Sequence, residues 1–225
     1  MDIYDRTGRL IGNEGVEVLK NSKVLIVGVG GVGSYVAEAI ARSGIGTVGL
    51  MDGDDVEITN FNRQLIALSD TLGRNKAEVM KERIGQINPA ADVRAFGYFY
   101  EEGTDLPVSE YDFVIDAIDS LNAKTALIKK CVDEDVRVVS AMGAGGKFGV
   151  EPFKIVDLSE THTCPVAKIM RKKLKAEGIE HLPVAFSPEK SIVPAEGKPG
   201  TLSYVPASMG LLLAGYVIRE LLGYN

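Results

Sequence analysis

Cysteine is scarce in this sequence. Of its 225 residues only Cys131 and Cys164 are cysteines, so a framework of several disulfides and a zinc site built from four cysteines are both excluded. Positive charge is also limited, because 25 Lys and Arg residues stand against 31 Asp and Glu residues and the net charge is −6. The overall charge therefore argues against binding to nucleic acid, although it leaves open a local basic face.

Long apolar stretches are few as well. The most apolar one, residues 205–218, is shorter than the roughly 20 residues that cross a bilayer, and Pro206 lies near its start. We expect a buried C-terminal helix there and no membrane span. The first residues carry no basic segment followed by an apolar core, so no signal peptide is expected. Together with the low cysteine content, this predicts a cytoplasmic protein.

What the sequence does contain is a regular alternation of strand and helix patterns. Its 45% hydrophobic and 25% charged residues are typical of a globular protein. The alternation predicts an α/β fold, a Rossmann-like doubly wound and mostly parallel sheet. Buried strands are predicted at 23–27, 47–51, 92–99, 111–115 and 137–141, and helices at 32–42, 74–88 and 121–133.

The pattern changes after residue 150. A mixed segment that contains a strand pattern predicts a crossover loop, and a basic stretch with a proline at its start predicts a helix. A later segment with three prolines predicts an exposed, mobile loop. The ranges are 153–156 for the strand, 165–178 for the basic helix with its final glycine, and 187–203 for the loop.

A glycine-rich turn follows the first strand. The stretch GVGGVG supplies Gly28, Gly30, Gly31 and Gly33 between a strand and a helix, where glycines let the backbone approach a phosphate at the helix N-terminus. Asp52 follows Gly33 by 19 residues, at the end of the next strand, where a carboxylate can bind ribose hydroxyls. The spacing predicts a nucleotide site.

The segment after this carboxylate favours a nucleotide with a reactive triphosphate over a hydride-transfer cofactor. Positive charge fixed beside the phosphates stabilises the charge that develops during displacement, and hydride transfer does not need it. The predicted helix that follows can add a second cation. The candidates in this region are Asn60, Asn62, Arg63 and Gln64 in NFNRQ, together with Lys76.

Two carboxylates follow the fourth predicted strand, where ligands of open α/β sheets bind. Either Asp116 or Asp119 could hold Mg²⁺ against the phosphates, because magnesium favours one or two carboxylates together with phosphate oxygens. The other acid would then cap the next helix. We favour Asp119 as the metal ligand.

The motifs GVGGVG, LMDGDDVEITNFNRQ, GRNKAEVMKERIGQINP and VIDAIDS resemble the ThiF/MoeB/HesA superfamily of ubiquitin-activating-type adenylating enzymes. Within it, NFNRQ, AMGAGGKF and KIVDLSETHTCPVAKIMRKKLK are similar to the tRNA threonylcarbamoyladenosine dehydratases. The resemblance covers nearly the whole chain. It implies a single adenylating domain over residues 1–225, with a nucleotide-binding core in about 1–150 and the crossover loop, basic helix and C-terminal elements in 151–225.

The resemblance also implies roles for particular residues. The glycine loop and Asp52 would hold adenosine and ribose, and Asp54 would also belong to the nucleotide site. Asn60 and Arg63 would contact the phosphates of ATP, Lys76 would lie over them, and Asp119 would bind Mg²⁺. An N-terminal arginine that reaches across a homodimer is implied as well, with Arg6 and Arg9 both open as candidates. Other members carry zinc on two CxxC pairs, which this chain lacks, so no zinc is expected.

The cysteines and the basic helix leave alternatives open. Cys131 lies in an apolar helix pattern and predicts a buried, inert thiol. Cys164 lies in the predicted crossover loop before a helix and is a candidate nucleophile, because a helix N-terminus can favour the thiolate. The basic helix is a candidate contact for tRNA phosphates through Lys168, Arg171, Lys172, Lys173 and Lys175.

These implications lead to one expected function and two alternatives. The expected function is ATP-dependent adenylation of a carboxylate, with cyclising dehydration of threonylcarbamoyladenosine 37 in tRNA and release of AMP and pyrophosphate. The first alternative is activation of the C-terminal glycine of a ubiquitin-like sulfur carrier, which could pass to Cys164. The second is a nucleotide-sensing protein without turnover. Whether a sulfur-relay protein assists the reaction and whether a monovalent cation occupies the site are left open by the sequence.

Overall fold

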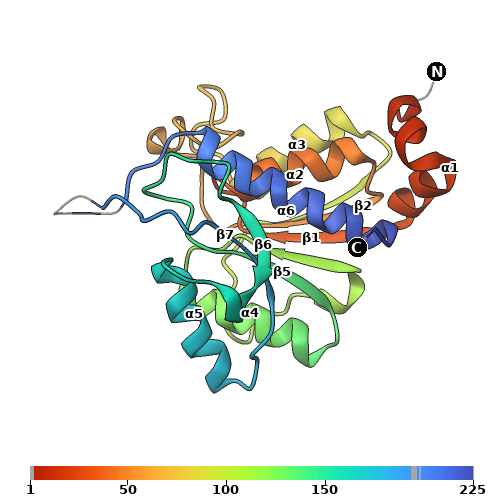
Figure 1. Cartoon of the computed structure of the whole chain (residues 1–225). Coiled ribbons are helices and arrows are strands. Elements are labelled where there is room, and N and C mark those ends of the chain that lie inside the picture. Colours follow the sequence, from red (N-terminus) through yellow and green to blue (C-terminus); the bar gives the residue numbers. More distant parts are fainter. Residues whose placement is uncertain (1–2, 194–196, 198, 225) are drawn as a thin grey trace.

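The computed structural model describes residues 3–193, 197 and 199–224. A seven-stranded sheet lies between two layers of helices (Figure 1). The strand order is β3-β2-β1-β4-β5-β7-β6, and every neighbouring pair is parallel except β6 with β7. The strands are β1 (Lys23–Val27), β2 (Thr47–Met51), β3 (Asp92–Phe96), β4 (Phe113–Asp116), β5 (Arg137–Ala141), β6 (Lys154–Asp157) and β7 (Pro183–Phe186).

The predicted doubly wound, mostly parallel α/β sheet is confirmed. Six α-helices accompany the strands within the described residues, and all the helices predicted from the sequence are present. They are α1 (Asp5–Asn21), α2 (Gly33–Ser43), α3 (Lys76–Ile87), α4 (Leu121–Asp133), α5 (Pro165–Ala176) and α6 (Tyr204–Leu222).

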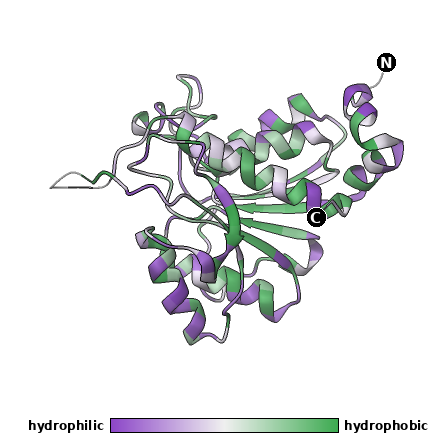
Figure 2. Ribbon diagram, in the orientation of Figure 1, coloured by the Kyte–Doolittle hydropathy of each residue, from purple (hydrophilic) through white to green (hydrophobic). Residues whose placement is uncertain are grey.

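The central strands are apolar on both faces because helices cover both. Ile26 of β1 packs into a cluster with residues of α2, α3 and α6, whereas Val27 belongs to the cluster formed with α4 and α5. This division follows from the pleat, which turns successive side chains to opposite faces. Figure 2 shows the apolar sheet in the middle and hydrophilic residues on the outer sides of the helices.

One α-helix and one strand of the described structure were not predicted from the sequence. Helix α1 contains three glycines and is kinked at Gly12, where φ is +73°, and glycine lowers helix propensity. Its buried Val16 and Leu19 hold it against the body of the protein. Strand β7 has only four residues and begins with a proline, so its pairing with β5 and β6, more than its local pattern, defines it.

Strand β3 is shorter than predicted. It ends at Phe96, not at residue 99, because its last partner is Met51, the final residue of β2. The chain then leaves the sheet, and residues 98–102 line the cavity described below. The predicted strand therefore merged a structural segment with a segment of the candidate site.

The C-terminal helix α6 is apolar enough and, with 19 residues, long enough to pass a simple test for a membrane-crossing segment. Its buried residues include Val205, Met209, Leu213 and Val217, which recur on one helical face. The helix packs closely on α2, where a Cβ at Gly210 would lie 2.5 Å from the carbonyl oxygen of Val32. The predicted buried C-terminal helix is confirmed.

The topology predicts a crevice at the carboxyl ends of the central strands. Strand β1 pairs with β2 on one side and with β4 on the other, so the strand order changes direction between β1 and β4. Loops that leave the carboxyl ends of strands on the two sides of such a point diverge, and ligands of open α/β sheets bind in the resulting crevice.

Candidate active site

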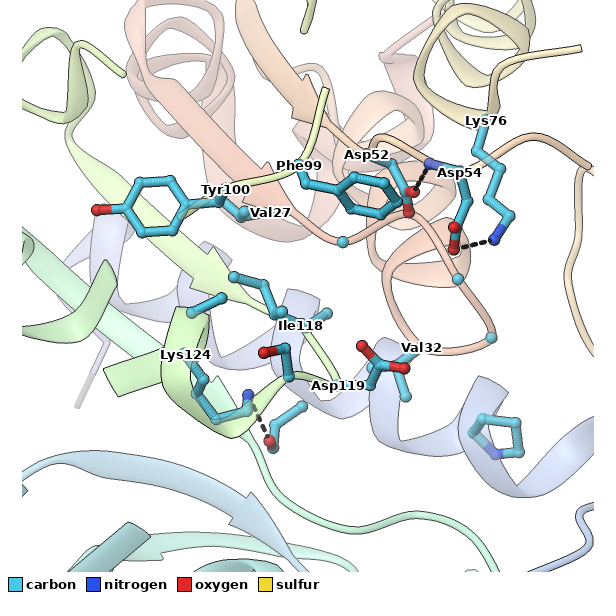
Figure 3. Close-up of a pocket in the computed structure, with 18 of the residues that line it drawn as sticks. Val27, Val32, Asp52, Asp54, Lys76, Phe99, Tyr100, Ile118, Asp119 and Lys124 are labelled. Carbon is cyan, nitrogen blue, oxygen red and sulfur yellow. Dashed lines mark hydrogen bonds and ion pairs between the residues drawn. The ribbon is translucent and has the colours of Figure 1, made fainter. Parts of the chain in front are cut away.

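A cavity of about 1010 Å³ opens at the carboxyl ends of the parallel strands. Figure 3 shows residues from the loops after β2 and β3 on one side of it and residues from the loop after β4 on the other. The cavity is lined by ten of the residues singled out in the sequence: Gly28, Gly30, Gly31, Asp52, Asp54, Asn60, Arg63, Gln64, Lys76 and Asp119.

The glycine turn brings the backbone to the floor of this cavity. Gly28 has φ +93°, and a Cβ there would lie 2.6 Å from the carbonyl oxygen of Ala117. The N–H groups of Gly30 and Gly31 have no acceptor among the described residues. They lie just before α2, so their N–H groups and the positive end of that helix can bind an anion such as phosphate.

Gly33 serves the packing of α2 and does not form part of the cavity wall. It is the first residue of α2. A Cβ at Gly33 would lie only 1.8 Å from the carbonyl oxygen of Gly28. Gly33 therefore lets α2 pack against the turn, as the last glycine of such a motif does in helix and strand packing.

Asp52 joins the end of β2 to the glycine turn. Its carboxylate accepts hydrogen bonds from the N–H of Val29 at 2.7 Å and from the N–H of Asp54 at 2.9 Å. Burial raises the pKa of Asp52, and these two hydrogen bonds counteract that shift. Each carboxylate oxygen retains a second lone pair, so the side chain can still accept a hydrogen bond from a ribose hydroxyl.

Lys76 is buried at the start of α3. Its side chain is 6% exposed, and its Nζ lies 2.8 Å from Oδ2 of the more exposed Asp54. The preceding residue, Asn75, caps the helix by accepting hydrogen bonds from two N–H groups of its first turn, and it donates to the carbonyl oxygen of Asp52. The cap fixes Lys76 at the cavity wall, so the lysine is not a solvated residue at the end of a helix.

Arg63 is held by its own neighbours. Its Nη1 donates to the carbonyl oxygen of Thr59 at 2.8 Å and to Oδ1 of Asn62 at 2.9 Å. Asn62 does not line the cavity, and it also donates to the carbonyl oxygen of Thr201. Asn62 thus orients the guanidinium and links it to the segment before α6.

Two amide side chains near Arg63, those of Asn60 and Gln64, line the cavity and are almost fully buried. Asn60 is 5% exposed, and its Oδ1 accepts the N–H of Glu57 at 3.1 Å. Gln64 is 7% exposed, and its Oε1 has no hydrogen-bond partner in the described part of the chain. An unsatisfied buried amide oxygen beside a cavity is free to bind a ligand.

The two carboxylates after β4 have separate environments. Asp116 is fully buried and forms an ion pair with Lys124 at 2.6 Å, and it does not line the cavity. Asp119 is exposed in the cavity and makes no hydrogen bond or ion pair with any described residue. Among the described residues no three His, Cys, Asp or Glu side chains are grouped to hold a metal, so Asp119 would bind one only together with ligand oxygens.

Several cavity residues were not identified from the sequence. Lys124, the aromatic segment 98–100 and the glycine-containing segment 142–145 all line the cavity. Phe99 is 61% exposed there, and Figure 3 places it beside Asp52. The two segments follow β3 and β5, so their position at carboxyl ends of strands was the available signal.

Comparisons with known proteins agree with this geometry. The model of the ThiF family matches residues 4–225. The chain belongs to the ThiF family. The tRNA threonylcarbamoyladenosine dehydratase of Bacillus subtilis strain 168 is 44% identical over 239 aligned positions, which cover 97% of this chain and 94% of that protein. This confirms the family indicated by the sequence motifs.

A sequence and a crystal structure from Escherichia coli extend the comparison. The tRNA threonylcarbamoyladenosine dehydratase of strain K12 is 42% identical over 176 positions, which cover 77% of this chain and 66% of that protein. A crystal structure of the Escherichia coli tRNA N6-threonylcarbamoyladenosine dehydratase in complex with ATP superposes with a TM-score of 0.90 and 36% identity. That superposition covers 98% of this chain and 93% of that one.

The two candidate N-terminal arginines of this ThiF-family chain also lie outside the cavity. Arg6 and Arg9 belong to α1, which lies at the end of the sheet away from the cavity loops (Figure 1), and neither lines the cavity. A single chain therefore does not bring these arginines into the site. A contribution from a second copy stays a prediction.

The two cysteines of the ThiF-family chain are both buried. Cys131 is fully buried, as predicted, and burial raises its pKa to about 12, which disfavours the thiolate. Cys164 is 3% exposed and lies at the N-cap of α5, and its Sγ would be 3.5 Å from a Cβ at Gly143. Gly143 lines the cavity, so Cys164 lies behind the cavity wall.

Proposed function

We propose that this protein catalyses the ATP-dependent dehydration of threonylcarbamoyladenosine 37 in tRNA. The observation that carries the proposal is the convergence of Arg63, Lys76 and Asp119 around a cavity whose floor is the start of α2. Such a cavity can bind a triphosphate and stabilise charge on it. The names of the B. subtilis and E. coli relatives and the ATP complex of the E. coli enzyme support the choice of substrates.

The first step would be formation of an acyl-adenylate. An oxygen of the threonylcarbamoyl carboxylate attacks the α-phosphorus of ATP, the bond from that phosphorus to the bridging oxygen breaks, and pyrophosphate leaves with the electron pair. Arg63 and Lys76 act on this step by stabilising the charge on the phosphates. Both cations are fixed by contacts within the protein, so little reorganisation is needed during the reaction.

The second step would close a ring. An atom within the threonylcarbamoyl group attacks the activated carbonyl carbon, the bond to AMP breaks, and a proton is lost. The nucleophile and the carbonyl belong to one molecule, so the step benefits from a high effective concentration. The net change in the nucleoside is the loss of one water, and no nucleophile of the enzyme is required.

Mg²⁺ would be held at Asp119. A single carboxylate without a protein partner, at the wall of a phosphate-sized cavity, fits an ion that takes its other ligands from phosphate oxygens and water. The ion would neutralise negative charge on the phosphates. The buried Asp116 is already engaged by Lys124 and is not available for this role.

The basic helix α5 is the proposed contact for tRNA. Its 12 residues contain five Lys and Arg residues and no acidic residue, so it carries a charge of +5 in a chain whose net charge is −6. Val166 near its start lines the cavity. Phosphates of an RNA whose modified base enters the cavity could therefore lie along the exposed lysines.

Replacing Lys168 or Lys172 by alanine is expected to raise the KM for tRNA several-fold with little change in kcat, because both lysines are exposed, lack an ion-pair partner in the described structure and lie outside the cavity. Each variant should also reduce the salt dependence of tRNA binding by about one charge. The matched control is Lys81→Ala on α3, which covers the opposite face of the sheet (Figure 1). Equal effects of all three variants would contradict a contact at α5.

A homodimer and a cytoplasmic location complete the proposal. In a dimer Arg6 or Arg9 of one protomer could approach the cavity of its partner, which a single chain does not allow. Sedimentation of the purified protein would test the dimer, and loss of adenylation in Arg6→Ala or Arg9→Ala would identify the arginine.

Mass spectrometry of nucleosides tests the function directly. Threonylcarbamoyladenosine-containing tRNA is incubated with the protein, ATP and Mg²⁺, digested under mild conditions and compared with a reaction lacking ATP. We expect the modified nucleoside to lose the mass of one water only when ATP is present. An unchanged mass, with AMP formed only on addition of a ubiquitin-like carrier protein, would favour the sulfur-carrier alternative.

Cys164→Ala separates the two candidate activities further. The ring closure needs no thiol, so we expect the variant to retain dehydration within about twofold, provided that the small cavity left by the sulfur is tolerated. The measurement is the rate of AMP release with tRNA. Loss of activity in a variant that keeps its melting temperature would show that the thiol participates in the reaction.

A further inference from the structure

A buried ionic cluster beneath the cavity has no part in the proposed chemistry. Asp116 at the end of β4 is 0% exposed, and Lys124 in the first turns of α4 is 1% exposed. The Nζ of Lys124 lies 2.6 Å from Oδ2 of Asp116, and the hydroxyl of Ser140 on β5 donates to the same oxygen at 2.6 Å. The cluster therefore joins one helix to two adjacent strands.

All three donor positions of the Lys124 ammonium are used. Besides Asp116, it donates to Oγ of Ser140 at 3.2 Å and to the carbonyl oxygen of Ala141 at 3.0 Å. The other oxygen of Asp116 accepts the N–H of Ile118 at 3.1 Å. A lysine that is saturated in this way cannot also bind a phosphate, although its side chain forms part of the cavity wall.

The hydrogen bonds of the cluster lie where two loops of the cavity begin, the loop after β4 and the loop after β5. The Asp116 carboxylate holds the N–H of Ile118, one residue before Asp119, and Lys124 holds the carbonyl of Ala141, one residue before the segment 142–145. Both loops line the cavity. Figure 3 shows Lys124 and Asp119 on the side of the cavity opposite Asp52 and Lys76.

Stability alone is a poor explanation for such a pair. Apolar side chains of similar volume can replace a buried ion pair without loss of stability, because removing two charges from water is costly. Directional bonds to two loops are a property that apolar packing would not supply. Side chains that support a metal ligand in this manner fix its orientation.

We propose that Lys124 is a positioning residue which, by fixing Asp116 and through it the N–H of Ile118, holds the loop of Asp119 at the cavity wall for the divalent ion. The inference rests on the proposed function, in which Asp119 binds the ion that accompanies ATP. If Lys124 acts in this way, replacing it should weaken binding of the divalent ion more than binding of ATP itself.

The test measures ion binding without turnover. Electron paramagnetic resonance follows the binding of Mn²⁺ to the protein in the presence of a non-hydrolysable ATP analogue, and calorimetry follows binding of the analogue without the ion. We expect Lys124→Met to weaken Mn²⁺ about tenfold and the analogue alone less than threefold. Lys124→Arg should restore most of the affinity for Mn²⁺, because a guanidinium can bond both Asp116 and the Ala141 carbonyl. The control is Lys129→Met, which breaks an exposed ion pair with Asp133 on the same helix.

A double variant separates positioning from stability. Lys124→Met leaves the Asp116 charge buried and unpaired, which lowers the melting temperature. The double variant Asp116→Asn with Lys124→Met leaves no unpaired charge, so it should recover much of the melting temperature but not the affinity for Mn²⁺. Recovery of both would overturn the inference, as would an unchanged Mn²⁺ affinity in folded Lys124→Met. If the wild-type protein binds the analogue but no Mn²⁺, the assignment of Asp119 fails and the inference with it; if it binds neither, the proposed adenylation fails.

Discussion

Replacing Arg63 by alanine is expected to reduce the rate of AMP formation about 10³-fold. The guanidinium is fixed by the Thr59 carbonyl and by Asn62 before any ligand arrives, and preorganised charge of this kind accounts for factors of about 10² to 10³ in phosphoryl and acyl transfer. A factor of 10³ corresponds to about 4 kcal/mol of transition-state stabilisation. The measurement is single-turnover release of AMP with saturating ATP and tRNA.

Two further variants serve as comparisons for Arg63→Ala. Arg74→Ala removes another arginine of the same region, whose ion pair with Glu82 is exposed, and should change the rate less than twofold. Asn62→Ala keeps the guanidinium but loosens it, so a loss of about tenfold is expected. A rate for Arg63→Ala within threefold of the wild-type rate would rule out a role of this cation in the reaction.

Replacing Gly33 by alanine is expected to destabilise the whole fold. The added Cβ would lie 1.8 Å from the carbonyl oxygen of Gly28, and neither backbone segment can yield, since Gly28 itself is held against Ala117 and hydrogen-bonded to Met51. Overpacking of this kind costs about 3 kcal/mol, or roughly 6 to 12 °C in the melting temperature of a chain of this size. Thermal unfolding followed by circular dichroism measures it, and binding of ATP should be lost with it.

Gly85→Ala is the matched substitution in the same protein. Gly85 lies in α3, and a Cβ there meets no atom within 4 Å. Because alanine favours a helix over glycine, this variant should be more stable by about 0.5 to 1 kcal/mol. Similar shifts of the melting temperature in both variants would contradict this explanation. They would show that the close approach of α2 to the glycine turn does not require a glycine at position 33.

Particular elements show how far sequence patterns reach. Strand β1, the glycine turn and α2 were predicted within about a residue of their observed bounds, because the apolar run and the helical face are local signals. Helix α1 was missed because its three glycines mask a helix that Val16 and Leu19 hold by tertiary packing. The end of β3 was misplaced because the length of β2, not the pattern of β3, decides where pairing stops.

The candidate site likewise has features that the sequence predicts and features that only the tertiary structure determines. The sequence by itself determined the α/β class, the family motifs, the glycine turn and the carboxylate 19 residues after it, since each depends on a short contiguous stretch. The tertiary structure buried Asp116 against Lys124 while leaving Asp119 exposed in the cavity, buried Lys76 at the cavity wall and placed Asn62 behind Arg63. These outcomes depend on partners far apart in the chain, such as Ser140 and Lys124 for Asp116. Burial and ion pairing follow from which strands and helices become neighbours in space, and no local pattern specifies that.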